Sequence, residues 1–483
     1  WLELPLYTSV VIYSQKRSIL LPDSSLSDTY YLAFEGKTNN GFGVCIDELM
    51  IQESGVTPKY VENISYHQAS TDFVATQSNN NPILRLDIEI EGNDGIINLD
   101  SLTVTSLNTD DSDLKPNGVK LRASNDTILE NSWQIGSGIN FSGGKAVFEN
   151  INYEIPRGLS SLWITYDVRA DNDHNTHGHI LDARIEADDI KINNNTFPLV
   201  YKSPNGSREV YESILYEDFE ATGGWSFTGE FERAEAQDPP LGGSVGNSDP
   251  DRAYQGSYMI GTDITGQGSR EGDYENNLSD RAYKATSPML DAFYYQDMNL
   301  YFYRWLNVDG LDSAYIDISD DNGQSWQTMW RNLGAIVMDK WEKSALDLSS
   351  YINRTDSVRL RFSIGGTDDS WAFSGWNIDN LVLTGDYISQ DVGVTGWIFP
   401  INGCGHTDEE SVQVQLTNFG GDPTADTIPL SYSFNGGTTI VKDTLYQSIP
   451  VGGTVNFTFG NAINLTQPGW YRDIYAQTDL QRD

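Results

Sequence analysis

Apolar and polar residues alternate along much of this chain, and the alternation predicts β-strands with one face in a hydrophobic core. Between Leu84 and Ile90, leucine or isoleucine occupies every second position and charged residues stand between them. The segments 301–304 and 412–417 alternate in a similar way. A period of two is typical of a strand, because successive side chains point to opposite faces of the sheet. No amphipathic pattern predicts a helix longer than about three turns.

Turn sequences separate these segments at short, regular intervals. Asn93-Asp-Gly95, Pro116-Asn-Gly118, Asp321-Asn-Gly323 and Asn435-Gly-Gly437 are examples. Asn and Gly are common in tight turns because both tolerate positive φ angles. Many short strands joined by such turns predict an all-β protein built from β-sandwich or jelly-roll modules.

Polar linkers divide the chain into four predicted modules. The segment 202–207, for example, is short and polar and contains Pro and Gly. We place module one at 1–52, a connector at 53–78, module two at 79–200, a linker at 201–215, module three at 216–386 and module four at 391–483.

Module one is a partial copy of module three. Trp1 to Ser24 aligns with Trp326 to Ser349 without a gap, and Cys45-Ile-Asp-Glu-Leu49 matches Asn377-Ile-Asp-Asn-Leu381. Module three has a long stretch before the copied region, whereas module one has none. We therefore expect the chain to begin inside a domain of a longer polypeptide.

Charge narrows the possible partners. The 483 residues include 30 Lys and Arg against 69 Asp and Glu, a formal net charge of −39. Nucleic acids and anionic membranes are therefore not expected as partners, because polyphosphate binding needs clustered Lys and Arg. The acidity favours divalent cations held by oxygen ligands. No run of apolar residues is long enough to predict a membrane span, and two cysteines make no disulfide framework.

Module three resembles the jelly-roll domains of the MAM and cleaved-adhesin type. The resemblance rests on Tyr216-Glu-Asp-Phe-Glu220, on Leu300-Tyr-Phe-Tyr-Arg-Trp305 and on Trp376-Asn-Ile-Asp-Asn-Leu381. It covers nearly the whole module, whereas module one shares only the closing half. The resemblance implies a non-catalytic binding domain, and related jelly rolls bind calcium.

Modules two and four resemble other accessory domains. Asn81-Pro-Ile-Leu-Arg-Leu86 and Leu162-Trp-Ile-Thr-Tyr-Asp167 are similar to the non-catalytic N-terminal domain of bacterial neuraminidases with BNR repeats. The catalytic propeller of that family is not present, so the resemblance implies no sialidase activity. Asp391-Val-Gly-Val394 and the segment 412–421 resemble an Ig-like, CARDB-like domain.

This combination of modules is similar to large surface proteins of Bacteroidota that are exported by type IX secretion. It implies a location outside the cell or on the bacterial surface, with further domains of the same polypeptide on both sides. The expected function is non-catalytic: binding glycans or surface proteins, or spacing other domains. The alternative is an accessory, carbohydrate- or substrate-binding region of a secreted peptidase or glycoside hydrolase whose catalytic domain lies outside this chain.

Ser319-Asp-Asp-Asn-Gly-Gln-Ser-Trp326 fits the Asp-box pattern S-x-D-x-G-x-x-W. We expect a structural turn in which the Asp321 carboxylate caps the backbone, Gly323 takes a positive φ and Trp326 folds back as a plug. The cut at Trp1 would remove the matching turn from module one.

Three carboxylates are candidate calcium ligands. Asp218 and Glu220 lie on the predicted first strand of module three, and Asp379 lies on its last. In a jelly roll these strands are neighbours, so the carboxylates would converge and favour a structural calcium ion, with the loop 247–251 able to supply further oxygens. The alternative is that these are solvated acids at strand ends.

Other side chains offer weaker signals. Trp371 and Phe373, near the rim of module three, and Trp133 could stack on sugars, although aromatic residues on strands more often belong to the core. His174, His177 and His179 could supply zinc ligands, but their spacing matches no standard motif and the segment is a polar loop. We expect that loop to be solvated.

Overall fold

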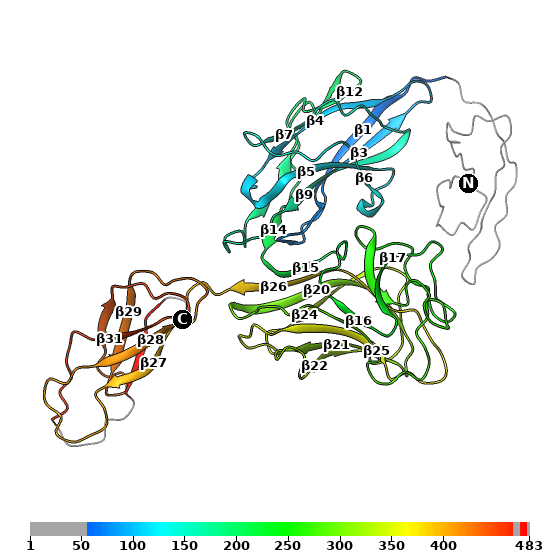
Figure 1. The fold of residues 1–483 in the computed structure, drawn as a ribbon. Coiled ribbons are helices and arrows are strands. Elements are labelled where there is room, and N and C mark those ends of the chain that lie inside the picture. The colour runs from blue at the N-terminus through cyan, green and yellow to red at the C-terminus, as the bar shows by residue number, and fades with distance from the viewer. Residues whose placement is uncertain (1–55, 467–473, 481–483) are drawn as a thin grey trace.

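The computed structural model describes residues 56–466 and 474–480, and nearly all of its regular structure is β-strand. Figure 1 shows three groups of strands, which correspond to modules two, three and four. Predicted module one, with its repeat and Cys45, lies outside the described residues. No helix among the described residues is long and apolar enough to cross a bilayer.

Module two is a sandwich of two antiparallel sheets around one core. The first sheet has the order β1(Tyr60–Gln68), β3(Asn81–Glu91), β9(Gly158–Val168), β5(Leu114–Ser124) and β6(Trp133–Gln134). The second has the order β11(Ala183–Arg184), β4(Asn98–Ser106), β12(Ile190–Ile192) and β13(Asn195–Phe197), with β7(Lys145–Phe148) and β8(Tyr153–Glu154) also paired to β4. The alternating leucines and isoleucines of β3 are fully buried between them, as their period predicts.

A small third sheet and two short 3-10 turns complete module two. The sheet has the order β10(Ile180–Leu181), β14(Arg208–Tyr211) and β2(Val74–Ala75), and the turns are η2(Asp111–Asp113) and η3(Leu129–Asn131). Strands β1 and β2 correct the prediction that 53–78 is a connector. Val61, Ile64 and Tyr66 of β1 pack against the core, although polar residues stand between them and on both sides of the strand.

Module three has two sheets packed face to face. The larger contains β17(Phe231–Glu235), β18(Tyr258–Thr262), β26(Gly375–Tyr387), β20(Tyr295–Val308) and β23(Ile336–Val337), with β15(Ser213–Glu217) paired to β26 and β24(Glu342–Asp347) paired to β20. The smaller, which we call the five-stranded sheet, has the order β16(Ser226–Thr228), β19(Tyr283–Thr286), β25(Arg359–Gly365), β21(Ser313–Ser319) and β22(Gln327–Arg331). Their inner side chains, including Trp376 and Phe362, form one continuous core.

Module four is a smaller sandwich of two antiparallel sheets. One sheet has the order β27(Val392–Phe399), β28(Gln413–Asn418) and β31(Thr454–Thr458), and the other has the order β30(Val441–Leu445), β29(Ile428–Ser433) and β32(Tyr475–Thr478). Val414 and Leu416 of β28 face a core with Leu430 and Tyr432 of β29. The described part of the chain is therefore all-β, as the alternation predicts.

Modules two and three are joined through a single residue. Strand β14 pairs within module two and ends at Tyr211, and β15 pairs within module three and begins at Ser213. Between them lies Glu212, which is 3% exposed. The prediction of a linker at 201–215 is therefore wrong for its second half. The residues that follow the polar segment 202–207 form β14 in a sheet of module two and then β15 in a sheet of module three.

Side chains from both modules interlock around this joint. The Phe73 ring of module two stacks on Tyr211 at 4.8 Å and also contacts Tyr301 of module three at 4.7 Å between ring centroids. The Thr76 and Ser213 hydroxyl oxygens lie 2.9 Å apart in a buried hydrogen bond. These contacts hold the two modules in a fixed relation, and Figure 1 shows β14 leading directly to the β15–β26 edge of module three.

Candidate functional site

The outer face of the five-stranded sheet carries polar and aromatic side chains in ordered rows. Directly opposed residues on antiparallel strands point to the same side of a sheet. One row runs across the strands as Thr228, Lys284, Ser363, Tyr315 and Arg331. The next runs as Ser226, Thr286, Arg361, Asp317 and Thr328, and beyond it Arg359 opposes Ser319. The intervening residues of these strands face the core.

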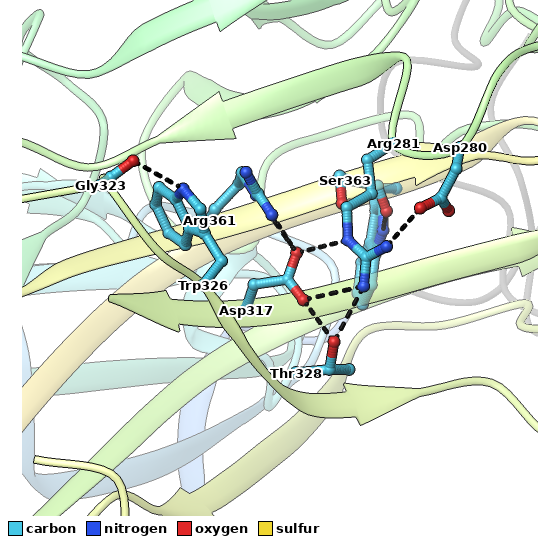
Figure 2. Close-up of polar contacts among 9 residues, drawn as sticks. Asp280, Arg281, Asp317, Gly323, Trp326, Thr328, Arg361 and Ser363 are labelled. Carbon is cyan, nitrogen blue, oxygen red and sulfur yellow. Dashed lines mark hydrogen bonds and ion pairs between the residues drawn. The ribbon is translucent and has the colours of Figure 1, made fainter. Parts of the chain in front are cut away.

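Asp317 lies at the centre of this face and holds two arginines in place. Arg281 donates from Nε to Asp317 Oδ2 at 2.8 Å, and Arg361 donates from Nη2 to the same oxygen at 2.8 Å. The Thr328 hydroxyl donates to Asp317 Oδ1 at 2.8 Å. Figure 2 shows the carboxylate lying between the two guanidinium groups. Although the Asp317 side chain is only 1% exposed, it is fully hydrogen-bonded.

The electrostatics of Asp317 follow from these contacts. Burial by itself would raise the pKa of the carboxyl, but hydrogen bonds from Arg281, Arg361 and Thr328 outweigh it and hold the pKa below its ordinary value. Asp317 is therefore a permanent anion at neutral pH. A carboxylate that accepts this many hydrogen bonds is suited to fixing cations in position and not to transferring protons.

The guanidinium groups lie against aromatic rings on the same face. Arg361 is centred 4.0 Å above the Trp326 ring, and Arg281 is 3.8 Å above the Tyr315 ring. A cation over the face of an aromatic ring is attracted by the ring quadrupole. These stacks flatten both arginines onto the sheet and cover ring faces that could otherwise stack on a ligand.

Arg281 reaches this face from a loop, and Gly365 makes its position possible. A Cβ atom on Gly365 would lie 2.3 Å from the Ser279 carbonyl oxygen and 2.7 Å from the Arg281 backbone nitrogen. Only glycine permits the loop before β19 to pack this closely on the end of β25. The loop also brings Asp280, which pairs with Arg281.

The charge of this face is opposite to that of the chain as a whole. Its cations are Arg281, Lys284, Arg331, Arg359 and Arg361, and its acids are Asp280 and Asp317. Among the described residues, no carboxylate forms an ion pair with Lys284, Arg331 or Arg359. We call this surface the arginine face. Sequence reasoning missed it, because the cations come from three strands and a loop and converge only when the sheet forms.

The predicted Asp-box forms the turn between β21 and β22 at the edge of the arginine face. Asp321 Oδ1 accepts from the Ser325 backbone N–H at 2.8 Å, and Gly323 has a φ of +85°. The Trp326 indole N–H donates to the Gly323 carbonyl at 3.1 Å. Trp326 therefore folds back over its own turn, where its ring also supports Arg361 (Figure 2).

The predicted calcium ligands lie at one end of module three, around the first turn after β15. Asp379 is fully buried and accepts from the backbone N–H groups of Gln255 at 2.8 Å and Asn380 at 2.6 Å. Burial raises the pKa of Asp379 well above its ordinary value, and the charges of Asp218 and Glu220 raise it further. Asp218 and Glu220 are thus both close enough to Asp379 to disfavour its charge.

The rest of that environment is occupied by protein hydrogen bonds. Glu220 Oε1 accepts from the backbone N–H groups of Ser257 at 2.7 Å and Tyr258 at 2.8 Å. In the loop 247–251, Asp249 accepts from the Asn377 amide at 2.6 Å. Within the described ranges, no group of three His, Cys, Asp or Glu side chains is arranged to hold a metal ion. Calcium at this end of module three remains a prediction.

Comparison with known proteins gives structural similarity at low sequence identity. No protein-family model matches the sequence, and no curated protein matches it either. A xylan-binding, family 22 carbohydrate-binding domain from Paenibacillus barcinonensis is 14% identical, with a TM-score of 0.24; the match covers 37% of this chain and 96% of that one. The K1 cleaved-adhesin domain of Lys-gingipain from Porphyromonas gingivalis is 10% identical, with a TM-score of 0.24, over 35% of this chain and 97% of that one.

A larger structure from Clostridium thermocellum also matches in part. It contains the family 22 carbohydrate-binding and family 10 modules of an endo-1,4-β-D-xylanase with xylohexaose, and it is 12% identical with a TM-score of 0.23. The match covers 37% of this chain and 29% of that chain. The chain therefore spans less than a third of that xylanase structure.

The predicted stacking residues differ in exposure. Trp371 is 59% exposed and Trp133 is 43% exposed, whereas Phe373 is 6% exposed and belongs to the core of module three. The prediction that Phe373 offers a stacking surface is therefore wrong, because its ring packs over Gly246. Stacking by Trp371 remains a prediction.

The histidine segment is largely exposed, as its polarity predicts, but His174 packs against module three. His174 lies flat on Tyr387 of module three, with 3.5 Å between ring centroids and 8° between ring planes. Its Nδ1 lies 2.5 Å from Glu212 Oε1, and the Tyr295 hydroxyl donates to the same oxygen at 2.6 Å. His174 thus fastens the joint between modules two and three, a role that depends on a contact far along the sequence.

Proposed function

We propose that this chain is a non-catalytic binding segment of an extracellular protein, and that it attaches to glycans or surface proteins through the arginine face of module three. The single observation that carries the proposal is the concentration of five cationic side chains on one sheet face of a chain with a net charge of −39. In so acidic a protein, a face whose five cations outnumber its two acids favours association with an anionic partner.

The chemistry of the face favours binding over catalysis. Its central carboxylate, Asp317, is held as an anion by two arginines and is not poised to exchange protons near neutral pH. Arg281 and Arg361 are fixed by ion pairs and by ring stacking. Rigid, pre-positioned cations lose little conformational entropy when a ligand binds.

The test is retention of the purified chain on a glycan array and on surface proteins extracted from bacterial and animal cells. We expect binding that Lys284→Glu combined with Arg331→Glu abolishes, because two cations of the arginine face become acids. Circular dichroism would show that the variant keeps its β-structure. If the unaltered chain is retained by no glycan and no surface protein, the binding function is contradicted and a spacer function takes its place.

We further propose that calcium binds at Asp218, Glu220 and Asp379 and stabilises module three. The support is electrostatic, since Asp218 and Glu220 disfavour the charge on Asp379 and a divalent cation would neutralise all three. A ligand that binds only the folded state at 100 times its Kd adds about 2.7 kcal/mol to the free energy of unfolding.

Thermal unfolding with EDTA and with millimolar calcium measures this effect. Calcium should raise the Tm of module three by roughly 5 °C or more. The rise should disappear in Asp379→Asn but persist in Asp339→Asn, which alters an exposed acid elsewhere in the module. An unchanged Tm on adding calcium to the unaltered chain would exclude a stabilising ion at this place.

We also propose a location outside the cell or on the bacterial surface, reached through type IX secretion. The support is the succession of all-β modules that resemble domains of such proteins. Protease treatment of intact cells that produce the full polypeptide would degrade this segment if it is displayed. Protection in intact cells and degradation only after lysis would contradict the proposal.

A further inference from the structure

We infer that the ligand of the arginine face is a polysaccharide that carries carboxylate groups, an inference that rests on the binding function proposed above. The cations of the face are spread over several strands. Lys284 on β19 and Arg331 on β22 belong to the same row, with β25 and β21 between them. Three interstrand spacings place their backbones about 14 Å apart. One small anion cannot contact both, so the ligand is a polymer with repeated charges.

The free donors of this face suit carboxylates. Arg361 directs Nε and Nη2 at Asp317, so its Nη1 group is not needed for that ion pair. Arg331 uses one nitrogen, Nη2, to reach the Ser313 hydroxyl at 3.0 Å. A guanidinium presents its N–H groups in a planar fork that matches the two oxygens of a carboxylate. Lys284 adds a compact charge at the other end of the row.

Hydroxyl groups lie between and beside the cations. Ser226 and Thr228 are exposed on this face, and Thr286, which is partly exposed, lies next to Arg361. Each hydroxyl both donates and accepts hydrogen bonds, as sugar hydroxyls do. The face therefore places hydroxyl-bearing side chains beside its cations, and an acidic polysaccharide likewise carries hydroxyls beside its carboxylates.

The face lacks the features that an acidic protein partner would need. Protein interfaces are centred on exposed apolar or aromatic anchors. Here Tyr315 is 8% exposed beneath Arg281, and the Trp326 ring lies under Arg361. A polar ligand that makes hydrogen bonds and ion pairs across a flat surface fits this arrangement better.

Nucleic acid fits less well for a related reason. Single strands bind through bases that stack on open aromatic faces, and the ring faces of Tyr315 and Trp326 are taken by guanidinium groups. A duplex would bring dense phosphate charge near a chain whose net charge is −39. The more widely spaced charges of an acidic polysaccharide reduce that repulsion.

The experiment measures binding of the complete chain to matched polymers by titration calorimetry. The probes are polygalacturonate, the same polymer with all carboxyls methyl-esterified, dextran sulfate, poly-L-glutamate and a single-stranded oligonucleotide. We expect binding to polygalacturonate that weakens as salt is added, and at least tenfold weaker binding to each of the others. Equal or tighter binding of the methyl ester, dextran sulfate, poly-L-glutamate or oligonucleotide would overturn the inference.

Variants locate the binding on the molecule. Lys284→Ala combined with Arg331→Ala should weaken polygalacturonate binding by roughly tenfold per lost charged contact. The control, Lys191→Ala with Lys340→Ala, removes the same charge from residues outside this sheet and should bind normally. Equal effects of the two variants would overturn the assignment to this face while leaving a binding function intact. Loss of all glycan and protein retention by the unaltered chain would instead contradict the proposed function itself.

Discussion

Asp182 illustrates how one buried carboxyl couples the stability of module two to pH. The residue is 7% exposed, and its Oδ1 accepts from the Ala183 backbone N–H at 2.7 Å. Burial raises its pKa to about 6, and the Ala183 hydrogen bond offsets this only in part. The folded state therefore holds the proton more tightly than the unfolded chain, in which the pKa of Asp is about 3.9. As a result, stability should fall as the pH rises from about 4 to about 6.

Replacing this carboxyl should remove the effect. Asp182→Asn keeps an oxygen for the Ala183 N–H and should raise the free energy of unfolding at pH 7 by up to about 3 kcal/mol. At pH 4 the gain should be close to zero, because the carboxyl is then protonated in the folded protein. Urea unfolding at both pH values measures this, with Asp94→Asn as an exposed control. A gain of the same size at both pH values would refute the explanation.

Asp317 shows the opposite coupling. Since the arginines hold its pKa below the ordinary value, its contribution to stability is present above about pH 4 and is lost as the pH falls through the folded-state pKa. Asp317→Asn removes the anion that Arg281 and Arg361 share, leaves Arg361 without an ion pair among the described residues, and should cost about 3 kcal/mol at pH 7. Asp280→Asn alters the exposed partner of Arg281 and should cost less than about 1 kcal/mol. Chemical unfolding that shows similar losses for both variants would contradict the central role of Asp317.

Among the elements, β25 depends on Gly365 at its end. Gly365→Ala places a Cβ atom against the backbone of Ser279 and Arg281, so the loop that carries Arg281 must move. We expect a loss of about 2 kcal/mol in stability and weaker binding at the arginine face. Gly366→Ala is the matched comparison for the steric effect, because a Cβ there meets nothing closer than 3.8 Å. Unfolding and polygalacturonate titration of both variants test this.

The strands themselves could be predicted from the sequence because their cause is local. Apolar and charged residues alternate between Leu84 and Ile90, a pattern that does not depend on the rest of the chain. Strand β3 forms there with its apolar side buried. Strands in segments with polar flanks were missed, as for β1 and β14. These two strands contain few apolar residues. They form because each pairs with a neighbouring strand that is far away in the sequence.

The arginine face could not be predicted for the same physical reason. Arg281, Asp317 and Arg361 are separated by 36 and 44 positions, and only the register of β21 against β25 brings them together. The contacts of the Asp-box, in contrast, all lie within residues 319–326, so its sequence pattern alone predicts the turn. Sequence therefore shows sites that are formed within one turn and does not show those that are assembled across a sheet.

At the scale of the whole molecule, we expect the joint at Glu212 to make modules two and three unfold as one unit. Glu212 accepts from Tyr295 and contacts His174, while the strands on either side of it belong to different modules. Glu212→Ala removes both contacts from a buried position and should cost about 2 kcal/mol.

Calorimetry tests whether the joint couples the modules. We expect the two modules to unfold in a single transition that Glu212→Ala splits into two. Glu209→Ala, an exposed neighbour on β14, should leave the single transition unchanged. Two separate transitions in the unaltered chain would show that the joint transmits no stability.

The pairing of β15 with β26 has a mechanical consequence. The chain enters module three at Ser213 and leaves it after Tyr387, and Ser213 lies directly opposite Thr384. Tension that pulls modules two and four apart would thus act on adjacent ends of two antiparallel strands. The hydrogen bonds between these strands would then break one after another, starting from the loaded end. The five-stranded sheet lies beside that line of force and not in it. A ligand held on its outer face would stay bound while the edge of the module yields.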